Sequence, residues 1–442
     1  MAKKKPKKQA KAKAAAKKLA RKVAKPAAKK ATGKSNNLPK PSSKPYGQAG
    51  RALDGLRILD FTHVQSGPTC TQLLAYMGAD VIKVEDTAGG DYLRFNPPVM
   101  AESGMSIHFH VLNRNKRSIA LDLKKKEGRE LLMELAGGWA NVLVEQFRPG
   151  VMDRLGVGYD TVKEVNPGLV YCSITGYGQD GPYRDIAGHD INYLGYAGVL
   201  GATGAADGPP VICGVQIADL GGGGMFGALS ILMAYTHAMR TGQGQHVDVS
   251  MMDGSLSWLS VNTGDVLVGG ESPPRQSQLL WGATPCYHVY EAADGFMAVG
   301  AIEDKFWKRM CEVLGRPEYG EMQFAVERFD EMFAWLSETF KEKTRDEWME
   351  LFGCEDTCVS PILDLVEVGE NPQVKHREMM PEVDDQKLGK MKTIGIPFKF
   401  SETPGEVRTS APKLGEHTDE VLKMLGCSDD DIARLKKDGV AC

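Results

Sequence analysis

The sequence predicts an α/β fold with a parallel β-sheet, followed by a smaller α+β domain. Short apolar runs alternate with helical stretches between residues 55 and 174, at a spacing typical of β-α-β units. Parallel strands need such crossovers, which are usually helices. From about residue 255 onward, Trp, Phe, Met and charged helical residues become prominent. We therefore expect a large α/β domain at 51–255, a small α+β domain at 256–385 and a C-terminal segment at 386–442.

The expected strands and helices follow one another along the large domain. Strands at 55–61 and 79–85 flank a helix at 69–77, which stops at Gly78. The pattern continues with strands at 118–123, 141–145 and 168–174 and helices at 126–135 and 159–165. Ligands of such sheets bind beyond the carboxyl ends of the strands. Residues 63–65, 145–147 and 175–178 fall at these ends.

The charge is unevenly distributed along the chain. Residues 1–34 hold 15 Lys or Arg and no acid, which leaves 39 basic and 57 acidic groups elsewhere. Residues 1–50 have few large apolar side chains, so we expect a disordered basic head and linker. Such a head could contact nucleic acid, an anionic membrane or the acidic body. We favour a solubilising or incidental extension, and do not expect a nucleic-acid partner.

Composition also bears on compartment and metals. The chain has no 18-residue apolar span and no secretory apolar segment, so we expect a soluble, cytoplasmic protein without a membrane span. Its nine cysteines are odd in number and form no C-x-x-C pair. His108 and His110 alternate on a possible strand, but no Cys or carboxylate cluster accompanies them. We therefore expect no metal site.

Asp219 is the most informative single residue. Apolar residues surround it and suggest a strand or buried turn, and four glycines at 221–224 lead into an apolar helix. Glycines let a ligand approach the backbone, and free N–H groups of a first helical turn can bind an oxyanion. Alternatively, Asp219 is an ordinary N-cap and the glycines only allow close helix packing. The local sequence leaves both interpretations open.

Nine runs, taken in order, resemble the class III CoA-transferase family, which includes the α-methylacyl-CoA racemases. The resemblance covers residues 52–442 and rests on the runs at 59–68, 78–85, 113–118, 143–150, 176–182, 187–193, 217–220, 241–249 and 411–418. It implies a Rossmann-like large domain completed by the segment 386–442, within an interlocked dimer. The dimer would be a homodimer or a heteromer with a related subunit. The substrates implied are coenzyme A, as an acyl-CoA, and a carboxylic acid.

The resemblance implies a covalent transfer mechanism. The residue matching Asp219 attacks the donor acyl-CoA, possible donors including succinyl-CoA, to give an aspartyl anhydride and then an enzyme–CoA thioester. Val64 and Gln65 resemble a pair in the formyl-CoA transferase branch, in which the glutamine helps to hold acyl intermediates. We predict a CoA-transferase on this ground. A subunit that binds CoA without catalysis is a further alternative, which the presence of Asp219 argues against.

An α-methylacyl-CoA racemase or epimerase is the main alternative. In racemases, the residues matching His189 and Asp219 exchange a proton on opposite sides of the α-carbon. Glu303 also matches the racemase pattern. However, the chain lacks the Gly-Pro-rich first turn of racemases and has the run at 63–68 instead. His189 could equally be a structural histidine, or bind a substrate carboxylate in a transferase.

Further residues are implied to contact CoA. A basic cluster resembles one that reaches phosphates, for which Lys and Arg are natural partners; alternatively, these are solvated surface charges. The cluster comprises Asn115, Lys116 and Arg117. The positions matching the CoA channel are Gln146, Phe147, Arg148, Arg154 and Met251, together with Val64.

Overall fold

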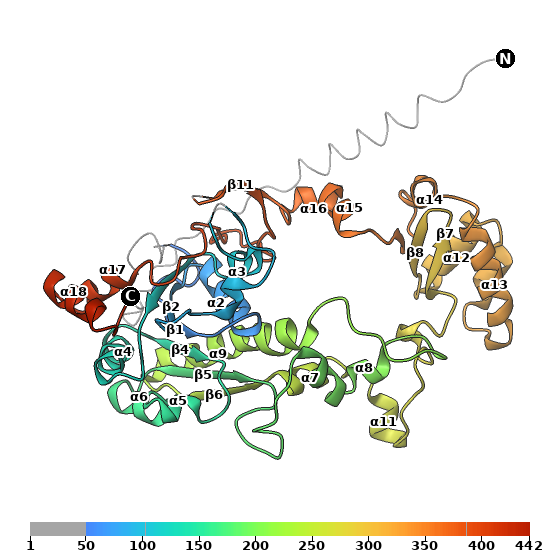
Figure 1. Ribbon diagram of the computed structural model, residues 1–442. Helices are drawn as coiled ribbons and strands as arrows, with labels where there is room; N and C mark the ends of the chain where they lie inside the picture. Colours follow the sequence, from blue (N-terminus) through green and yellow to red (C-terminus); the bar gives the residue numbers. More distant parts are fainter. Residues whose placement is uncertain (1–49, 102, 386) are drawn as a thin grey trace, which may run out of the picture. The chain divides into compact units, whose positions relative to one another are not determined.

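A six-stranded parallel sheet forms the centre of the large domain. The computed structural model describes residues 50–101, 103–385 and 387–442, so nearly all of the predicted basic head lies outside the described residues. The strand order is β3-β2-β1-β4-β5-β6, and all neighbours are parallel (Figure 1). This confirms the predicted α/β class. The strands are β1 (Arg57–Phe61), β2 (Asp80–Glu85), β3 (Lys116–Ala120), β4 (Val142–Glu145), β5 (Val170–Thr175) and β6 (His246–Ser250).

Helices cover both faces of this sheet, because alternate side chains of its buried strands point to opposite faces. On one face Ile58, Val81 and Val144 pack with α2 (Ser66–Tyr76), α7 (Asp190–Tyr196) and α9 (Phe226–Thr241). On the other face Leu59, Ile82 and Leu143 pack with α4 (Lys126–Gly138), α5 (Val151–Arg154) and α6 (Tyr159–Val165). Two apolar layers therefore hold the sheet from both sides.

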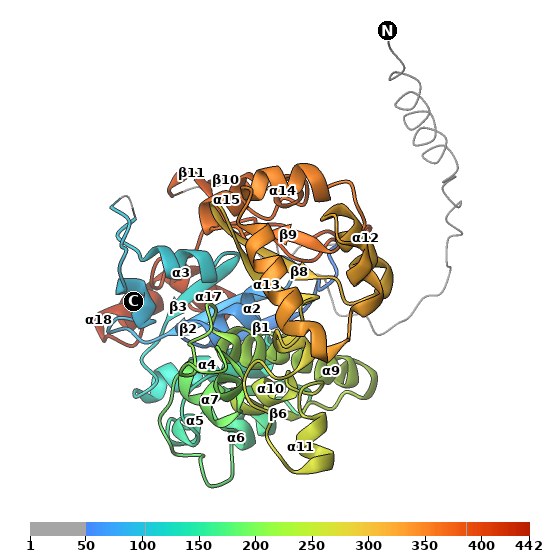
Figure 2. The same ribbon diagram turned by 90° about the vertical axis from the view of Figure 1, so that its right-hand side faces the viewer.

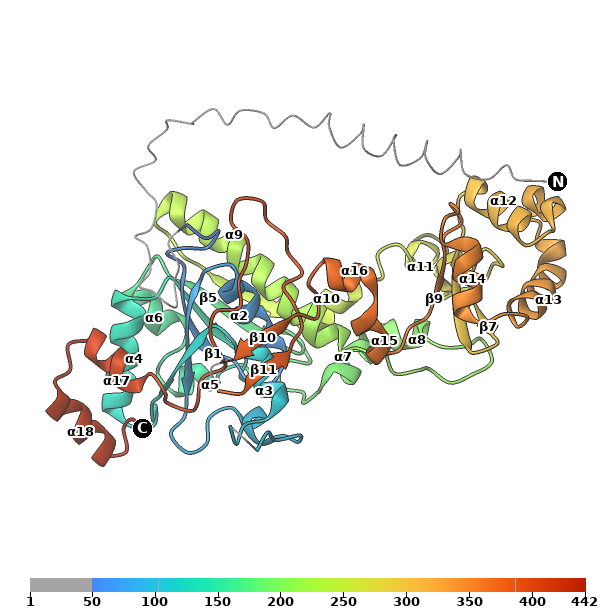
Figure 3. The ribbon, with the colours of Figure 1, turned by 90° about the horizontal axis from the view of Figure 1, so that it is seen from above.

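The C-terminal residues pack against the same sheet. Two helices, α17 (Thr418–Met424) and α18 (Asp429–Lys437), add Val421 and Ile432 to the core that α4 covers. Figure 3 shows them beside α4, and Arg434 of α18 bonds Glu127 of α4 at 2.6 Å. An isolated backbone bridge joins Ala441 to Leu121, the residue that follows β3. The C-terminal residues therefore pack at the edge of the sheet that β3 forms.

A second, antiparallel sheet has its own core. It contains β7 (Tyr287–Ala292), β8 (Gly295–Gly300) and β9 (Val359–Pro361). Figure 2 shows α12 (Asp304–Val313), α13 (Phe329–Phe340) and α14 (Arg345–Phe352) around it. Trp307, Phe340 and Trp348 fill this core, as expected from the aromatic residues in that stretch.

The remaining elements are short. They are η1 (Tyr92–Phe95), α3 (Ile107–Leu112), α8 (Val199–Ala202), η2 (Ala218–Met225), α10 (Met251–Ser257), α11 (Gly264–Gly269), η3 (Leu279–Trp281), η4 (Pro317–Met322), η5 (Val326–Arg328), α15 (Leu365–Glu370), α16 (Pro372–His376), β10 (Glu382–Asp385) and β11 (Gly389–Lys392). His108 and His110 lie on helix α3, so the prediction of a strand there was wrong. The Ser106 side chain caps this helix by accepting from the His108 N–H.

Within the described parts of the chain, no helix is long and apolar enough to cross a membrane.

Charged side chains pair inside the sheet around β1, β2 and β3. The Lys116 ammonium lies 3.0 Å from the Asp60 carboxylate, and both side chains are fully buried. Arg117 donates two hydrogen bonds of 2.8 Å to Asp80, and the Asn115 amide donates to the Glu406 carbonyl. The sequence suggested that residues 115–117 contact phosphates of CoA. The structure instead buries all three in contacts within the protein, and none of them lines the pocket described below.

Replacing Lys116 by Met should destabilise the protein by about 3–5 kcal/mol, because Asp60 would be left as a buried carboxylate without its nearest cation. Urea denaturation would measure the change in the free energy of unfolding. Lys126→Met is the matched control, since Lys126 forms an exposed pair with Glu130 at 3.2 Å and such pairs contribute about 0–1 kcal/mol. Near-equal stability of the two variants would contradict a structural role for Lys116.

Candidate active site

The main candidate site lies where the strand order of the sheet reverses. The chain leaves β1 and β4 in opposite directions, and in such sheets ligands bind in the crevice between these two strand ends. Here that crevice is a pocket of about 710 Å³. The segments after β1 and β4 meet across it, because the Gly67 N–H donates to the Gln146 Oε1 at 2.8 Å. The strand ends at which the sequence predicted a ligand site therefore border this pocket.

The turn between β1 and α2 has a strained backbone. Val64 has a φ of 62°, which is unfavourable for a β-branched residue. Its N–H is 3.2 Å from each oxygen of the buried Asp91 carboxylate. Strained residues of this kind often occur at ligand sites. The next residue, Gln65, lines the pocket and donates its amide to the Gln216 side chain at 3.3 Å.

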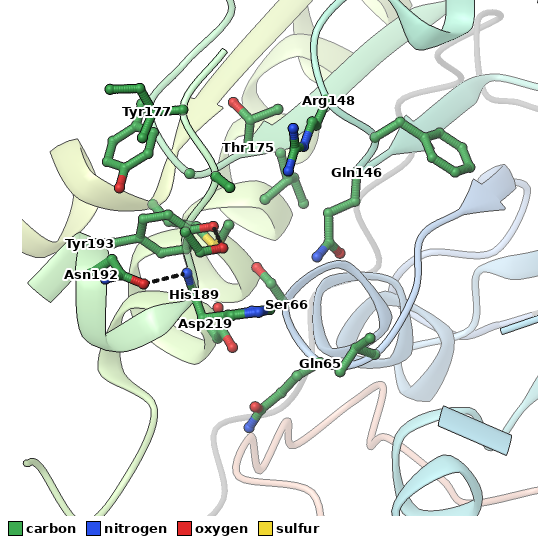
Figure 4. Close-up of a pocket in the computed structure, with 18 of the residues that line it drawn as sticks. Gln65, Ser66, Gln146, Arg148, Thr175, Tyr177, His189, Asn192, Tyr193 and Asp219 are labelled. Atoms are coloured by element: carbon green, nitrogen blue, oxygen red, sulfur yellow. Dashed lines mark hydrogen bonds between the residues drawn. The ribbon is translucent and has the colours of Figure 1, made fainter. Parts of the chain in front are cut away.

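Asp219 lies in the first turn of η2, a π-helix over Ala218–Met225 that continues into α9. Its side chain is not the N-cap. Instead, the Asp190 Oδ1 accepts hydrogen bonds from the Ala218 N–H at 2.7 Å and the Asp219 N–H at 3.1 Å. These two donors are therefore engaged, and the sequence-based suggestion that first-turn N–H groups bind an oxyanion does not hold for them. The Asp219 carboxylate itself lines the pocket (Figure 4).

The glycines after Asp219 allow close packing. A Cβ on Gly222 would lie 2.5 Å from the Met251 carbonyl oxygen, and one on Gly223 would lie 2.0 Å from the Ser66 Oγ. Larger residues would push α10 and α2 away from η2. The packing interpretation of the glycines is thus correct, and it brings Asp219 close to the first turn of α2. Short π-helical segments within helices are frequent at functional sites.

The surroundings of Asp219 alter its acidity. Burial, with a smaller contribution from the neighbouring Asp190 carboxylate, raises the pKa of Asp219 to about 7. Burial also raises the pKa of Asp190. The pKa of the nearby Tyr193 phenol is raised by burial and by the charge of Asp219. A carboxyl group with a pKa near neutrality can react as a carboxylate or carry a proton, so Asp219 suits both chemistries considered.

His189 is exposed on the wall of the same pocket. It directly precedes α7, and its backbone N–H donates to the Asn192 Oδ1 at 3.0 Å (Figure 4). Asp190 is the first residue of that helix. At the start of α7, His189 therefore lines the pocket, and the neighbouring Asp190 side chain bonds the first turn of η2, which carries Asp219.

The structure brings most predicted site residues together, but not all. Those lining the pocket are Val64, Gln65, Gln146, Phe147, Arg148, His189, Asp219 and Met251. Arg154 is exposed at the end of α5, and Glu303 is exposed just before α12; neither lines this pocket. Asn115, Lys116 and Arg117 are buried elsewhere, as described above.

Several residues of the site were not singled out from the sequence. Asp190, Ser66, Tyr193 and Gln216 all contact or line the site. Asp190 had one available signal, since an acidic residue at a helix start often bonds backbone N–H groups. Among the described residues, no group of three or more His, Cys, Asp or Glu side chains is arranged to hold a metal ion.

Known proteins resemble this chain over most of its length. A formyl-CoA:oxalate CoA-transferase of Rhodopseudomonas palustris (strain TIE-1) is 37% identical over 418 residues, covering 88% of this chain and 97% of the relative. An acyl-CoA transferase of Fusarium pseudograminearum (strain CS3096) is 37% identical over 411 residues, covering 88% of each.

Solved structures agree with the fold. The crystal structure of a CAIB/BAIF family protein from Brucella suis has a TM-score of 0.75 and 32% identity, and the match covers 85% of this chain and all of that one. The crystal structure of Rv3272 from M. tuberculosis has a TM-score of 0.73 and 28% identity, and the match covers 84% of this chain and 99% of that one. The sequence model of CoA-transferase family III matches residues 53–418. The chain therefore belongs to CoA-transferase family III, as its sequence runs predicted.

Proposed function

We propose that the protein moves CoA from an acyl-CoA donor to a carboxylic acid, with Asp219 as the nucleophile. The observation that carries this proposal is the Asp219 carboxylate, which lines the pocket at the strand-order reversal and has a pKa of about 7. The relatives named as formyl-CoA:oxalate CoA-transferases support transfer between small acids. Succinyl-CoA and formyl-CoA are the donors to test first.

Four displacements at carbonyl carbons make up the reaction. An Asp219 oxygen attacks the donor thioester carbon, and the C–S bond breaks to give an anhydride and CoA thiolate. The thiolate then attacks the aspartyl carbonyl carbon, which releases the donor acid and leaves an Asp219–CoA thioester. The acceptor carboxylate attacks that thioester, so a second anhydride forms and the thiolate is expelled again. Finally, the thiolate attacks the acceptor carbonyl, giving the new acyl-CoA and free Asp219 carboxylate.

Other pocket residues have roles that follow from their position. Arg148 provides a cation for the phosphates of CoA, and Val64, Gln146, Phe147 and Met251 line the space for its pantetheine arm. Gln65 lies at the start of α2 and would donate its amide to acyl oxygens of the intermediates. We further propose a dimer, homomeric or with a related subunit. Three apolar side chains are exposed on η2 and α9, namely Met225, Leu229 and Met233. Their exposure supports the proposal that a second subunit covers this surface.

A racemase is the second candidate, because His189 and Asp219 line the same pocket. A racemase needs two groups that exchange protons with one α-carbon. A transferase needs only the carboxylate nucleophile, and in that case His189 positions substrate from the pocket wall.

Asp219→Ala should abolish CoA transfer, since no other carboxylate side chain lines the described pocket. After incubation of the wild-type protein with donor acyl-CoA, hydroxylamine should convert Asp219 to a hydroxamate that peptide mass spectrometry detects. Circular dichroism and light scattering should show the same fold and the same dimer for both proteins. Substantial residual transfer by the variant would contradict covalent catalysis at Asp219.

The initial rate of transfer should rise with pH through about 7, because only ionised Asp219 attacks and its ionised fraction grows above its pKa. Asp190→Asn should move the inflection of the pH–rate profile to lower pH. The change removes a like charge but keeps a side-chain oxygen that can accept from the Ala218 and Asp219 N–H groups. An unchanged inflection would show that Asp190 does not influence the ionisation of Asp219.

Isotope exchange separates the two candidate chemistries. In heavy water, a racemase must place deuterium on the α-carbon of a 2-methylacyl-CoA, and His189→Ala must stop this exchange. We expect no such exchange, but transfer of CoA to an added acid, which His189→Ala weakens mainly through a higher KM. Rapid deuteration without transfer to any acid in a panel would favour the racemase.

A further inference from the structure

The Ser66 hydroxyl is a polar group of the pocket that has no role so far. Ser66 is the first residue of α2, is 1% exposed and lines the pocket together with Asp219. Its Oγ has no hydrogen-bond partner within the described ranges. A buried hydroxyl normally finds a partner, and the exceptions in native proteins need a specific explanation. A substrate atom that bonds the Ser66 hydroxyl only during the reaction would explain why this hydroxyl has no partner within the protein.

Four donors in this part of the pocket are already engaged. The Ala218 and Asp219 N–H groups donate to Asp190. The Gly67 N–H donates to Gln146, and the Gln65 amide bonds Gln216 at the longer distance of 3.3 Å. A carbonyl oxygen that gains negative charge beside Asp219 needs a donor that is available without breaking a bond. The Ser66 hydroxyl meets this requirement.

The packing of η2 also keeps this hydroxyl in place. A Cβ on Gly223 would lie 2.0 Å from the Ser66 Oγ, so any larger residue there would displace the hydroxyl. Gly223 belongs to the same π-helix as Asp219. Figure 4 shows Ser66 next to Asp219, with the two side chains projecting from different elements.

We propose that the Ser66 hydroxyl donates a hydrogen bond to the acyl carbonyl oxygen while Asp219 attacks the thioester. This inference rests on the proposed transferase function. As the Asp219 oxygen bonds to the thioester carbon, the carbonyl electron pair moves onto the oxygen, which Ser66 stabilises. The pair then returns, the C–S bond breaks and CoA leaves as the thiolate. Ser66 keeps its proton throughout.

The chain offers a matched control on the same helix. Thr69 also has a buried Oγ1 without a hydrogen-bond partner in the described part of the chain. It lies three residues further along α2 and is not among the residues that line the pocket. Thr69→Val removes that hydroxyl with little change of shape, as Ser66→Ala removes the other. The two variants therefore differ mainly in whether the lost hydroxyl faces substrate.

The test is a single-turnover measurement of Asp219 acylation, using rapid mixing with donor acyl-CoA and mass spectrometry of the quenched protein. Ser66→Ala should acylate about 10²-fold more slowly, which is typical for loss of one oxyanion donor, with an unchanged Kd for free CoA. Thr69→Val should acylate within about twofold of the wild-type rate. Thermal melting verifies that both variants fold.

Equal acylation rates for Ser66→Ala and Thr69→Val would overturn the inference, because Ser66 would then be a packing residue only. A weaker Kd for CoA with an unchanged acylation rate at saturation would also overturn it, by assigning Ser66 to ground-state binding. If the wild-type protein transfers CoA but the Ser66 variant is unaffected, the proposed function stands without Ser66. If the wild-type protein neither acylates nor transfers, the proposed function fails and this inference fails with it.

Discussion

The pair of hydrogen bonds that Asp190 accepts from the Ala218 and Asp219 N–H groups connects two parts of the chain that lie far apart in the sequence. It joins the start of α7 to the start of η2, across 28 and 29 residues of sequence. The Asp190 carboxylate satisfies these two donors at the start of the helix, and the Asp219 side chain lies in the pocket. The same contact places a second negative charge near Asp219, which helps burial to raise the pKa of Asp219 to about 7.

The opposite wall of the pocket depends on buried ionic contacts under α2. The Lys116 ammonium bonds the Asp60 carboxylate at 3.0 Å and the Pro68 carbonyl oxygen at 3.1 Å, so it links β3, β1 and the first turn of α2. That turn follows the strained Val64 and presents Gln65 and Ser66 to the pocket. Lys116 thus supports the site from inside the protein, although it does not contact the pocket.

The parts of the fold that the sequence predicts well are those encoded locally. Strands β1, β2, β4 and β5 are short runs rich in apolar residues and largely buried on both faces, and their predicted positions agree with the structure within two residues. Strand β6, with exposed His246 and Asp248, lacks this pattern and was not predicted. Helix α18 was also missed, because its polar residues outnumber the two that it buries, Ile432 and Leu435.

The site could be predicted in outline but not in its details. Asp219, Gln65, His189 and the residues after β4 were predicted from their motifs and strand-end positions, and they line the described pocket. Residues 115–117 were expected to bind phosphates because they resemble a basic cluster of the family, whereas tertiary pairing buries them here. The contact of Asp190 and the lack of a partner for the Ser66 Oγ exist only in three dimensions. No local pattern distinguishes a π-helix from the α-helix that follows it.

The most direct test of the account follows oxygen atoms through one turnover. If Asp219 forms anhydrides with both acids, an acceptor acid labelled with ¹⁸O in its carboxylate must leave one labelled oxygen on Asp219 when the new acyl-CoA departs. Peptide mass spectrometry after turnover should then show a single ¹⁸O in the peptide that contains Asp219, and the donor acid released in later turnovers should acquire label. Product formation without label in that peptide would contradict covalent transfer through Asp219.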